Sequence, residues 1–368
     1  MIIAAPATSR ALPIAPATAA GSFWQREELT MSQFARRSFL RGAAALSVAG
    51  LAGRPRRAQA AEFVLKYANN VPATHPISLR MKEAAERVLK ESGGRVEIRM
   101  FPNNQLGGDT DMLAQLRSGA LEMFTLSGNI LATLTKPTSI YGVGYAFGDY
   151  RQVWAAVDGE LGAYMRGVIA KLGLHPLEKM WDNGFRQITT STRPINTPDD
   201  LKGFKIRVPV SPQWTSLFKA LGAAPTSINF NEVYSALQTR IVDGQENSLQ
   251  LIEIAKLYEV QKHVSVTNHM WDGFFTLFNG RVWASLPPNL QELVARIVDE
   301  AAVREREDMV KLNTVSEEKL KKAGMVFNRT DPAAFRAVLA RSSYYQDWKS
   351  TYGPQAWAIL EKYTGPLG

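Results

Sequence analysis

The 368-residue sequence contains no cysteine, which excludes disulfide scaffolds, zinc ribbons, iron–sulfur centres and thiol nucleophiles together. It also lacks the P-loop G-x-x-x-x-G-K, the zinc-protease H-E-x-x-H and the hydrolase G-x-S-x-G. Gly142, Gly144 and Gly148 miss the dinucleotide-binding spacing by one residue, and turns explain them better. The four histidines are scattered, and His263 and His269 share no helix face. We therefore predict no metal, no cofactor and no enzyme, although carboxylate acid–base catalysis stays open.

Outside the N-terminal stretch, basic residues outnumber acidic ones only slightly. The chain has 43 Lys+Arg and 34 Asp+Glu, a net charge of +9. Residues 1–60 hold eight Arg and two Glu, so the remaining 308 residues carry 35 basic and 32 acidic groups. A balance this mild does not indicate nucleic-acid binding. The length and the 45% hydrophobic content predict a globular protein of about two domains.

Long apolar runs are also absent, since no stretch approaches the 18 residues of a membrane span. The N-terminal stretch instead has the features of an export signal. Arg36-Arg37-Ser38-Phe39-Leu40-Arg41 resembles the twin-arginine consensus, the weakly apolar run Gly42–Gly53 follows, and Ala58-Gln59-Ala60 is an A-x-A cleavage site. A buried helix of the fold is the alternative interpretation.

We therefore expect residues 1–60 to comprise a disordered start and a twin-arginine signal peptide. The mature chain would begin at about Ala61 and reach the periplasm by the twin-arginine pathway. Because Met31 begins a signal peptide of ordinary length, the start codon is either Met1 or Met31.

The rest of the chain alternates strand and helix patterns. Apolar periodicity predicts a strand, a helix, a strand, a helix and a strand at 63–68, 78–91, 96–100, 112–116 and 121–126. A second series predicts a strand, a helix, a short strand and a helix at 204–208, 214–221, 226–228 and from Asn231, the last with Val233, Leu237 and Ile241 on one face. This order predicts two α/β lobes with largely parallel sheets and a small-molecule cleft between them.

One long helical pattern runs from Pro288 to about Lys322. Leu290, Val294 and Ile297 follow the 3-4 spacing, and no Pro or Gly interrupts it after Pro288. A helix of this length would be roughly 50 Å long at ~1.5 Å per residue. It is therefore expected to brace both lobes.

Several segments together resemble a known family. They are Trp181-Asp182-Asn183-Gly184-Phe185-Arg186, Leu201-Lys202-Gly203-Phe204-Lys205-Ile206-Arg207-Val208-Pro209, the stretch 232–247 ending in Gly244-Gln245-Glu246-Asn247, and the early loop Phe101–Gly108. Over essentially all of 62–330 the sequence is similar to the DctP-type solute-binding proteins of TRAP (tripartite ATP-independent periplasmic) transporters. The resemblance implies an α/β, two-lobed periplasmic binding protein fold (type II-like) with a long helix connecting the lobes.

The alternation of the 204–208 strand independently singles out Arg207. Its apolar side chains share one face, so Lys205 and Arg207 point the other way, and Pro209 ends the strand. A side chain at the carboxyl end of such a strand faces the crevice where α/β sheets bind ligands. The alternative is a solvated arginine on a sheet edge. The resemblance favours the first reading, because it places Arg207 at the position of the family's carboxylate-clamping Arg, whose guanidinium grips a carboxylate through two hydrogen bonds.

The resemblance implies three further ligand-binding residues. Arg186 matches a second ligand-facing Arg, although its strand parity places it with Ile188 and does not support a cleft position. Asn247 matches an Asn that hydrogen-bonds the ligand, and it would also suit a helix N-cap. Phe230 matches an aromatic that packs on the ligand, with an ordinary core position as the alternative.

Trp181, Trp214 and Trp271 lie in or near segments expected to border the cleft. Core packing is the competing interpretation for each of them. If two of the three line the pocket, an aromatic or otherwise bulky carboxylate fits better than a C4-dicarboxylate. All three are therefore candidate ligand-binding residues.

The resulting hypothesis is a monomeric periplasmic receptor that binds a small organic carboxylate and delivers it to TRAP membrane permease subunits for ion-gradient-driven uptake. Two alternatives remain: a periplasmic enzyme that acts on a carboxylate, and a sensor subunit for a signalling partner. The expected lobes comprise 62–183 with 273–312 (lobe I) and 184–272 with 313–368 (lobe II).

Overall fold

The computed structural model describes residues 60–367. The predicted signal peptide and cleavage site lie outside the described residues, except for Ala60. No helix among the described residues is both long and apolar enough to cross a bilayer.

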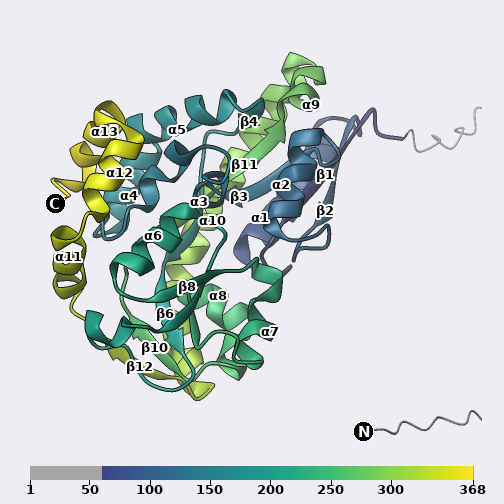
Figure 1. Ribbon diagram of the computed structural model, residues 1–368. Helices are drawn as coiled ribbons and strands as arrows, with labels where there is room; N and C mark the ends of the chain where they lie inside the picture. The colour runs from purple at the N-terminus through teal and green to yellow at the C-terminus, as the bar shows by residue number, and fades with distance from the viewer. Residues whose placement is uncertain (1–59, 368) are drawn as a thin grey trace, which may run out of the picture. The chain divides into compact units, whose positions relative to one another are not determined.

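Two six-stranded sheets form the framework of the described residues (Figure 1). The first has the order β2-β1-β3-β11-β4, with β5 also paired to β11; its strands are β1 (Phe63–Asn69), β2 (Val96–Phe101), β3 (Met123–Ser127), β4 (Leu174–Pro176), β5 (Trp181–Phe185) and β11 (Trp271–Asn279). The second has the order β12-β10-β6-β9-β7-β8; its strands are β6 (Gln187–Thr190), β7 (Lys205–Val208), β8 (Ala224–Ser227), β9 (Gly244–Asn247), β10 (His263–Val266) and β12 (Val326–Arg329). We call the parts built on these sheets lobe I and lobe II.

Short helices cover both sheets. Those that precede or follow strands of lobe I are α1 (Pro76–Glu91), α2 (Asp109–Ser118), α3 (Gly128–Leu131), η1 (Lys136–Gly142), α4 (Tyr150–Val157), α5 (Glu160–Ala170) and α9 (Gly280–Ser285). Those of lobe II are η2 (Pro198–Leu201), α6 (Pro212–Ala220), η3 (Phe230–Glu232), α7 (Val233–Gln238), α8 (Leu249–Ile254) and η4 (Leu257–Glu259). The fold is thus the two-lobed α/β class that the sequence predicts.

The sheets are mixed rather than largely parallel, which corrects the expectation. In lobe I, β1 pairs in parallel with β2 and β3, whereas β11 is antiparallel to β3, β4 and β5. The strand β11 carries the chain back from lobe II and therefore enters the sheet in the opposite direction. The expectation of a parallel sheet came from the strand and helix pattern of residues 63–126. That pattern could not indicate that β11, far away in the sequence, joins the same sheet.

The predicted long helix is α10 (Pro288–Lys322), and it is attached to both lobes. Arg80 on α1 donates to both carboxylate oxygens of Asp308, at 2.6 and 3.0 Å, which ties the helix to lobe I. Near its C-terminal end, Ser316 Oγ donates to Glu253 on α8 of lobe II at 2.8 Å. The expectation that this helix braces both lobes is confirmed.

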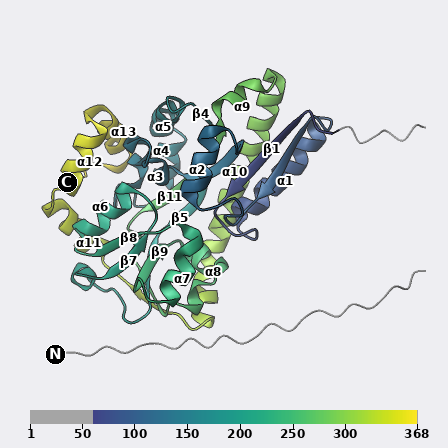
Figure 2. The ribbon, with the colours of Figure 1, turned by 45° about the vertical axis from the view of Figure 1, so that its right-hand side comes forward.

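The C-terminal helices are α11 (Pro332–Arg341), α12 (Tyr344–Tyr352) and α13 (Pro354–Thr364). They were expected with lobe II, yet α13 packs on α4, α5 and η1 of lobe I, while α11 and α12 reach α6 (Figure 2). Trp357 and Tyr352 are buried in this layer. We keep the predicted lobe division as a proposal, with 344–367 moved to lobe I.

Candidate functional site: a charged cavity between the lobes

A small cavity lies between the two sheets, with a volume of about 20 Å³. Lobe I contributes Asn70, Asp109, Ser127, Ile130, Asn183, Asp272 and Phe274 to its lining, whereas lobe II contributes Arg207, Pro209, Trp214, Phe230, Asn247 and Leu251; Arg186 joins the two. Ligand pockets usually measure ~300–1,000 Å³, so a solute can enter this cavity only if the lobes lie further apart than they do here.

Arg207 is the buried cation of lobe II in this cavity. Strand β7 buries Ile206 and Val208 on one face, and Arg207, on the other, is only 1% exposed. Its Nε and Nη2 both donate to the Ile228 carbonyl, at 2.9 and 2.7 Å. Its Nη1 has no hydrogen-bond partner among residues 60–367. A guanidinium fixed on one side and open on the other is arranged to receive an acceptor from outside the chain.

Among residues 60–367, Glu246 and Asp109 attract the charge of Arg207 without forming a direct ion pair with it. Burial lowers the pKa of Arg207 to about 10, opposed by the attraction of Glu246. The guanidinium therefore stays protonated at neutral pH. A bound anion would relieve the cost of burying this charge.

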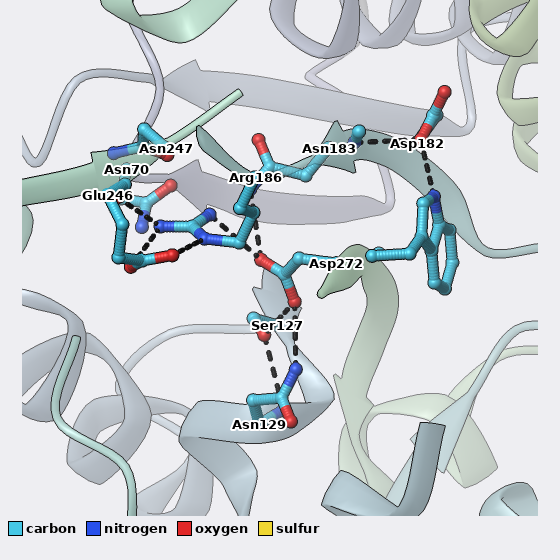
Figure 3. A network of polar contacts seen from close by, with 12 residues as sticks. Asn70, Ser127, Asn129, Asp182, Asn183, Arg186, Glu246, Asn247 and Asp272 are labelled. Atoms are coloured by element: carbon cyan, nitrogen blue, oxygen red, sulfur yellow. Dashed lines mark hydrogen bonds and ion pairs between the residues drawn. The ribbon is translucent and has the colours of Figure 1, made fainter. Parts of the chain in front are cut away.

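Arg186, by contrast, is already engaged by carboxylates of the chain. It lies between β5 and β6, where the chain crosses from lobe I to lobe II, and is 2% exposed. Its Nη2 donates to Glu246 Oε1 at 2.8 Å, and its Nη1 lies 3.5 Å from Asp272 Oδ2. Figure 3 shows the guanidinium between these two side chains. Arg186 lines the cavity, but its donors are largely used within the protein.

The pKa values of the two carboxylates beside Arg186 are shifted in opposite directions. Burial raises the pKa of Glu246, but the neighbouring Arg186 and a hydrogen bond from His269 outweigh burial and leave the pKa lowered. For Asp272, burial prevails and the pKa is raised, with Arg186 acting against it. His269 Nε2 lies 3.0 Å from Glu246 Oε2, and burial lowers its pKa. Glu246 is therefore the principal counter-ion of Arg186.

The other predicted site residues divide into two groups. Asn247, Phe230 and Trp214 line the cavity together with Arg207 and Arg186. Asn247 ends β9, and the N-cap of the next helix is Ser248, so its predicted capping role is wrong. Trp214 lies in α6 beside Arg186, whose Cζ is 4.9 Å from the indole ring centre.

Trp181 and Trp271 are not among the residues that line the cavity. Both are at most 1% exposed, and their indole N–H groups donate within lobe I, to Thr276 Oγ1 and to Asp182 Oδ1, each at 2.8 Å. These two side chains occupy the core behind the cavity. The condition that favours an aromatic carboxylate, two of three Trp in the pocket, is not met.

Sequence analysis missed the lobe I side of the cavity. Asn70 follows the carboxyl end of β1, Ser127 ends β3, and Asp109 is the first residue of α2. The rule that identified Arg207, namely position at the carboxyl end of a parallel strand, also applies to Asn70 and Ser127. Asp272 could not be found in this way, because β11 runs antiparallel.

Within residues 60–367, no group of three or more His, Asp or Glu side chains is arranged to hold a metal ion. The chemistry of the lining is that of recognition by hydrogen bonds and charge, with polar groups contributed by both lobes.

The two lobes line a charged cavity, and the chain passes between them at β5–β6 and at β10–β11. Together with the long helix attached to both lobes, this arrangement defines a periplasmic-type solute-binding protein. The chain belongs to the bacterial extracellular solute-binding protein family 7 (DctP), whose model matches residues 67–350.

Relatives of the chain are named as binding proteins. The C4-dicarboxylate-binding protein DctB of Bacillus subtilis is 30% identical over 261 residues, 71% of this chain and 74% of that protein. The 2,3-diketo-L-gulonate-binding periplasmic protein YiaO of Escherichia coli is 30% identical over 296 residues, 80% of this chain and 90% of that protein. A TRAP periplasmic solute-binding protein from Polaromonas sp. JS666, solved with D-erythronate, matches with a TM-score of 0.77 and 28% identity, covering 81% of this chain and 98% of that one.

Proposed function

We propose that the protein is a periplasmic receptor that binds a small organic carboxylate in the interlobe cavity and delivers it to a TRAP-type membrane permease for ion-gradient-driven uptake. In this proposal it acts as a monomer, is not an enzyme, and reaches the periplasm by the twin-arginine pathway. The solutes named for the relatives, a C4-dicarboxylate, a diketo sugar acid and D-erythronate, are all organic acids, which supports this solute class.

The observation that carries the proposal is the buried Arg207, whose Nη1 has no partner within the described chain. We assign it the role of carboxylate anchor, with Asn247, Phe230 and Trp214 as further contacts. Arg186 would act on the solute mainly as a neighbouring charge, because Glu246 and Asp272 occupy its donors. We expect a small acid rather than a bulky aromatic one, because Trp181 and Trp271 do not line the cavity.

The test combines a panel of acids with a matched pair of variants. The thermal unfolding temperature is measured with dicarboxylates, keto acids, sugar acids and aromatic acids. We expect one class to raise it, because a ligand at ~100 times its Kd stabilises the folded state by about 2.7 kcal/mol. Arg207→Ala is expected to weaken binding of that acid at least about a hundredfold in titration calorimetry.

Lys205→Ala is the control, because Lys205 lies two residues away on the same strand and is exposed. It should bind as the parent does. A loss of only a few-fold in Arg207→Ala would contradict the anchor role. Release of a chemically altered acid after prolonged incubation would instead favour an enzyme.

A further inference from the structure

The cavity presents hydrogen-bond acceptors that a bare carboxylate, which itself only accepts, cannot use. Besides the Nη1 of Arg207, the Nε1 of Trp214 is a buried donor without a partner in the described chain. Among the acceptors, the buried Oδ1 atoms of Asn70, Asn183 and Asn247 accept no hydrogen bond from residues 60–367. These three side chains are at most 6% exposed.

The orientation of two of these amides is determined by their partners. Asn70 Nδ2 donates to Asp109 Oδ1 at 2.8 Å, and Asn183 Nδ2 donates to Asp272 Oδ2 at 2.9 Å. An ionised carboxylate only accepts hydrogen bonds, so the amide NH₂ group must face it in each pair. The carbonyl oxygens of Asn70 and Asn183 are therefore left to accept a hydrogen from another molecule. Figure 3 shows Asn183 beside Asp272.

Asp109 adds a carboxylate to this acceptor side. It is 2% exposed and lies at the start of α2, on the lobe opposite Arg207. A second anionic group of a solute placed here would meet like charge and acceptors without hydrogens. A hydroxyl meets both requirements, because it donates to these oxygens and its burial costs less than that of an ammonium group.

We propose that the solute is a hydroxylated carboxylate: its carboxylate is held by Arg207 and Trp214, and its hydroxyl groups donate to Asn70, Asn183 and Asp109. This inference rests on the proposed receptor function and specifies the solute class. An acid without hydroxyls leaves buried carbonyl oxygens unpaired, which a site built to hydrogen-bond a hydroxyl penalises strongly.

The test uses acids that share a carbon skeleton and differ in hydroxyl number. Titration calorimetry compares succinate with malate and tartrate, and hexanoate with gluconate, with all stereoisomers of the four-carbon acids included. We expect the best hydroxylated member of at least one series to bind about tenfold tighter per hydroxyl than its parent acid. Equal binding of parent and hydroxylated acids, no binding in either series, or preference for aspartate over malate would each overturn the proposal.

Two variants assign the preference to the acceptor side. Asp109→Asn and Asn183→Leu should each weaken binding of the hydroxylated acid about tenfold or more, while changing binding of the parent acid by less than about threefold. In Asn183→Leu, Asp272 retains its bonds from Ser127 and Asn129, which supports folding of the variant. Asp199→Asn, on an exposed side chain of lobe II, is the matched control and should change neither.

The same data separate this inference from the receptor function. If a parent acid binds tightly and Arg207→Ala abolishes that binding while Asp109→Asn and Asn183→Leu leave the preference unchanged, the receptor stands and the hydroxyl assignment fails. If Arg207→Ala leaves binding of every acid unchanged, the anchor role of Arg207 fails, and if no acid of the whole panel binds, the receptor proposal itself fails. Thermal unfolding of each variant confirms that it is folded before titration.

Discussion

At the scale of single residues, the Glu246 carboxylate offsets the cost of burying the charge of Arg186. Both side chains are at most 2% exposed, and His269 contacts the same carboxylate. A buried ion pair adds little net stability compared with apolar residues of the same size, but removal of one partner leaves an uncompensated charge. The interlobe crossing at Arg186 therefore depends on Glu246 being ionised.

We predict that Glu246→Gln lowers the free energy of unfolding by about 3 kcal/mol, because Asp272, at 3.5 Å, is the remaining carboxylate beside Arg186. Chemical denaturation at neutral pH measures this loss. The control is Glu300→Gln, which removes a carboxylate from an exposed pair with Arg87 on the surface of α10. Such a pair contributes ~0–1 kcal/mol, so similar losses in both variants would contradict the role of Glu246.

At the same scale, strand parity succeeded for Arg207 and failed for Arg186. Arg207 lies inside β7, where alternation holds. Parity grouped Arg186 with Ile188, but Arg186 lies between β5 and β6, and its backbone N–H donates to the Met270 carbonyl of the returning crossover. Alternation does not continue through a crossing, so the sequence alone could not place this side chain.

At the scale of elements, a contact between α2 and the segment after β8 joins the two lobes at the edge of the cavity. Asn229 Nδ2 donates to Thr110 Oγ1 at 3.0 Å. Gly108 allows this approach, since a Cβ there would lie 2.9 Å from Asn229 Nδ2. Neither Asn229 nor Thr110 lines the cavity. In the proposed receptor, the pair would stabilise the arrangement in which both lobes line the cavity, here called the closed form, without contacting the solute.

We predict that Asn229→Ala weakens solute binding about three- to tenfold, because the energy of one hydrogen bond is lost from the closed form. Thr110→Val should have a similar effect, and the double variant should be no weaker than either single one. Titration calorimetry on the three variants measures this. Additive losses would show that the two side chains act separately and contradict the interlobe contact.

Long elements were easier to predict than short ones. The apolar 3-4 spacing gave both ends of α10, whereas the helix from Asn231 was extended too far, since α7 ends at Gln238 and Ile241 is 62% exposed. Arg240 there has φ of +59°, which ends the helix. The cavity was half predictable: its lobe II side lies in recognisable motifs, but its lobe I side depends on how strands distant in the sequence are paired.

At the scale of the whole described molecule, the long helix α10 packs on strand β5 over a buried pair of acids. Asp182, on β5, and Glu305, on α10, are both fully buried, and Glu305 Oε2 accepts the Asp182 backbone N–H at 2.9 Å. Burial raises the pKa of Asp182 to about 6, and burial together with the charge of Asp182 raises the pKa of Glu305 well above its usual value. Both groups therefore keep their protons to a higher pH in the folded state than in the unfolded state.

We predict that Glu305→Gln stabilises the protein relative to the parent by at least about 1 kcal/mol more at about pH 8 than at about pH 5. The folded state binds more protons than the unfolded one, so the stability that these acids contribute is complete below about pH 4 and is lost as pH rises through their raised pKa values. Gln cannot ionise and avoids this loss. Chemical denaturation at both pH values tests it.

Glu307→Gln is the control for this pH effect, because Glu307 is exposed on the same helix. It should leave the pH dependence of unfolding unchanged. A difference between Glu305→Gln and the parent that does not change with pH would show that Glu305 is not forced to ionise inside the protein.

The buried guanidinium of Arg207 lowers the stability of the fold while serving the proposed binding of a solute. Arg207 is buried, its Nη1 has no partner among residues 60–367, and a leucine or methionine of similar volume would cost the fold less. In the proposed receptor, the chain therefore gives up part of its stability until a carboxylate pairs with Arg207. Stabilising substitutions are therefore best sought away from the cavity, on the exposed faces of α10 and the C-terminal helices.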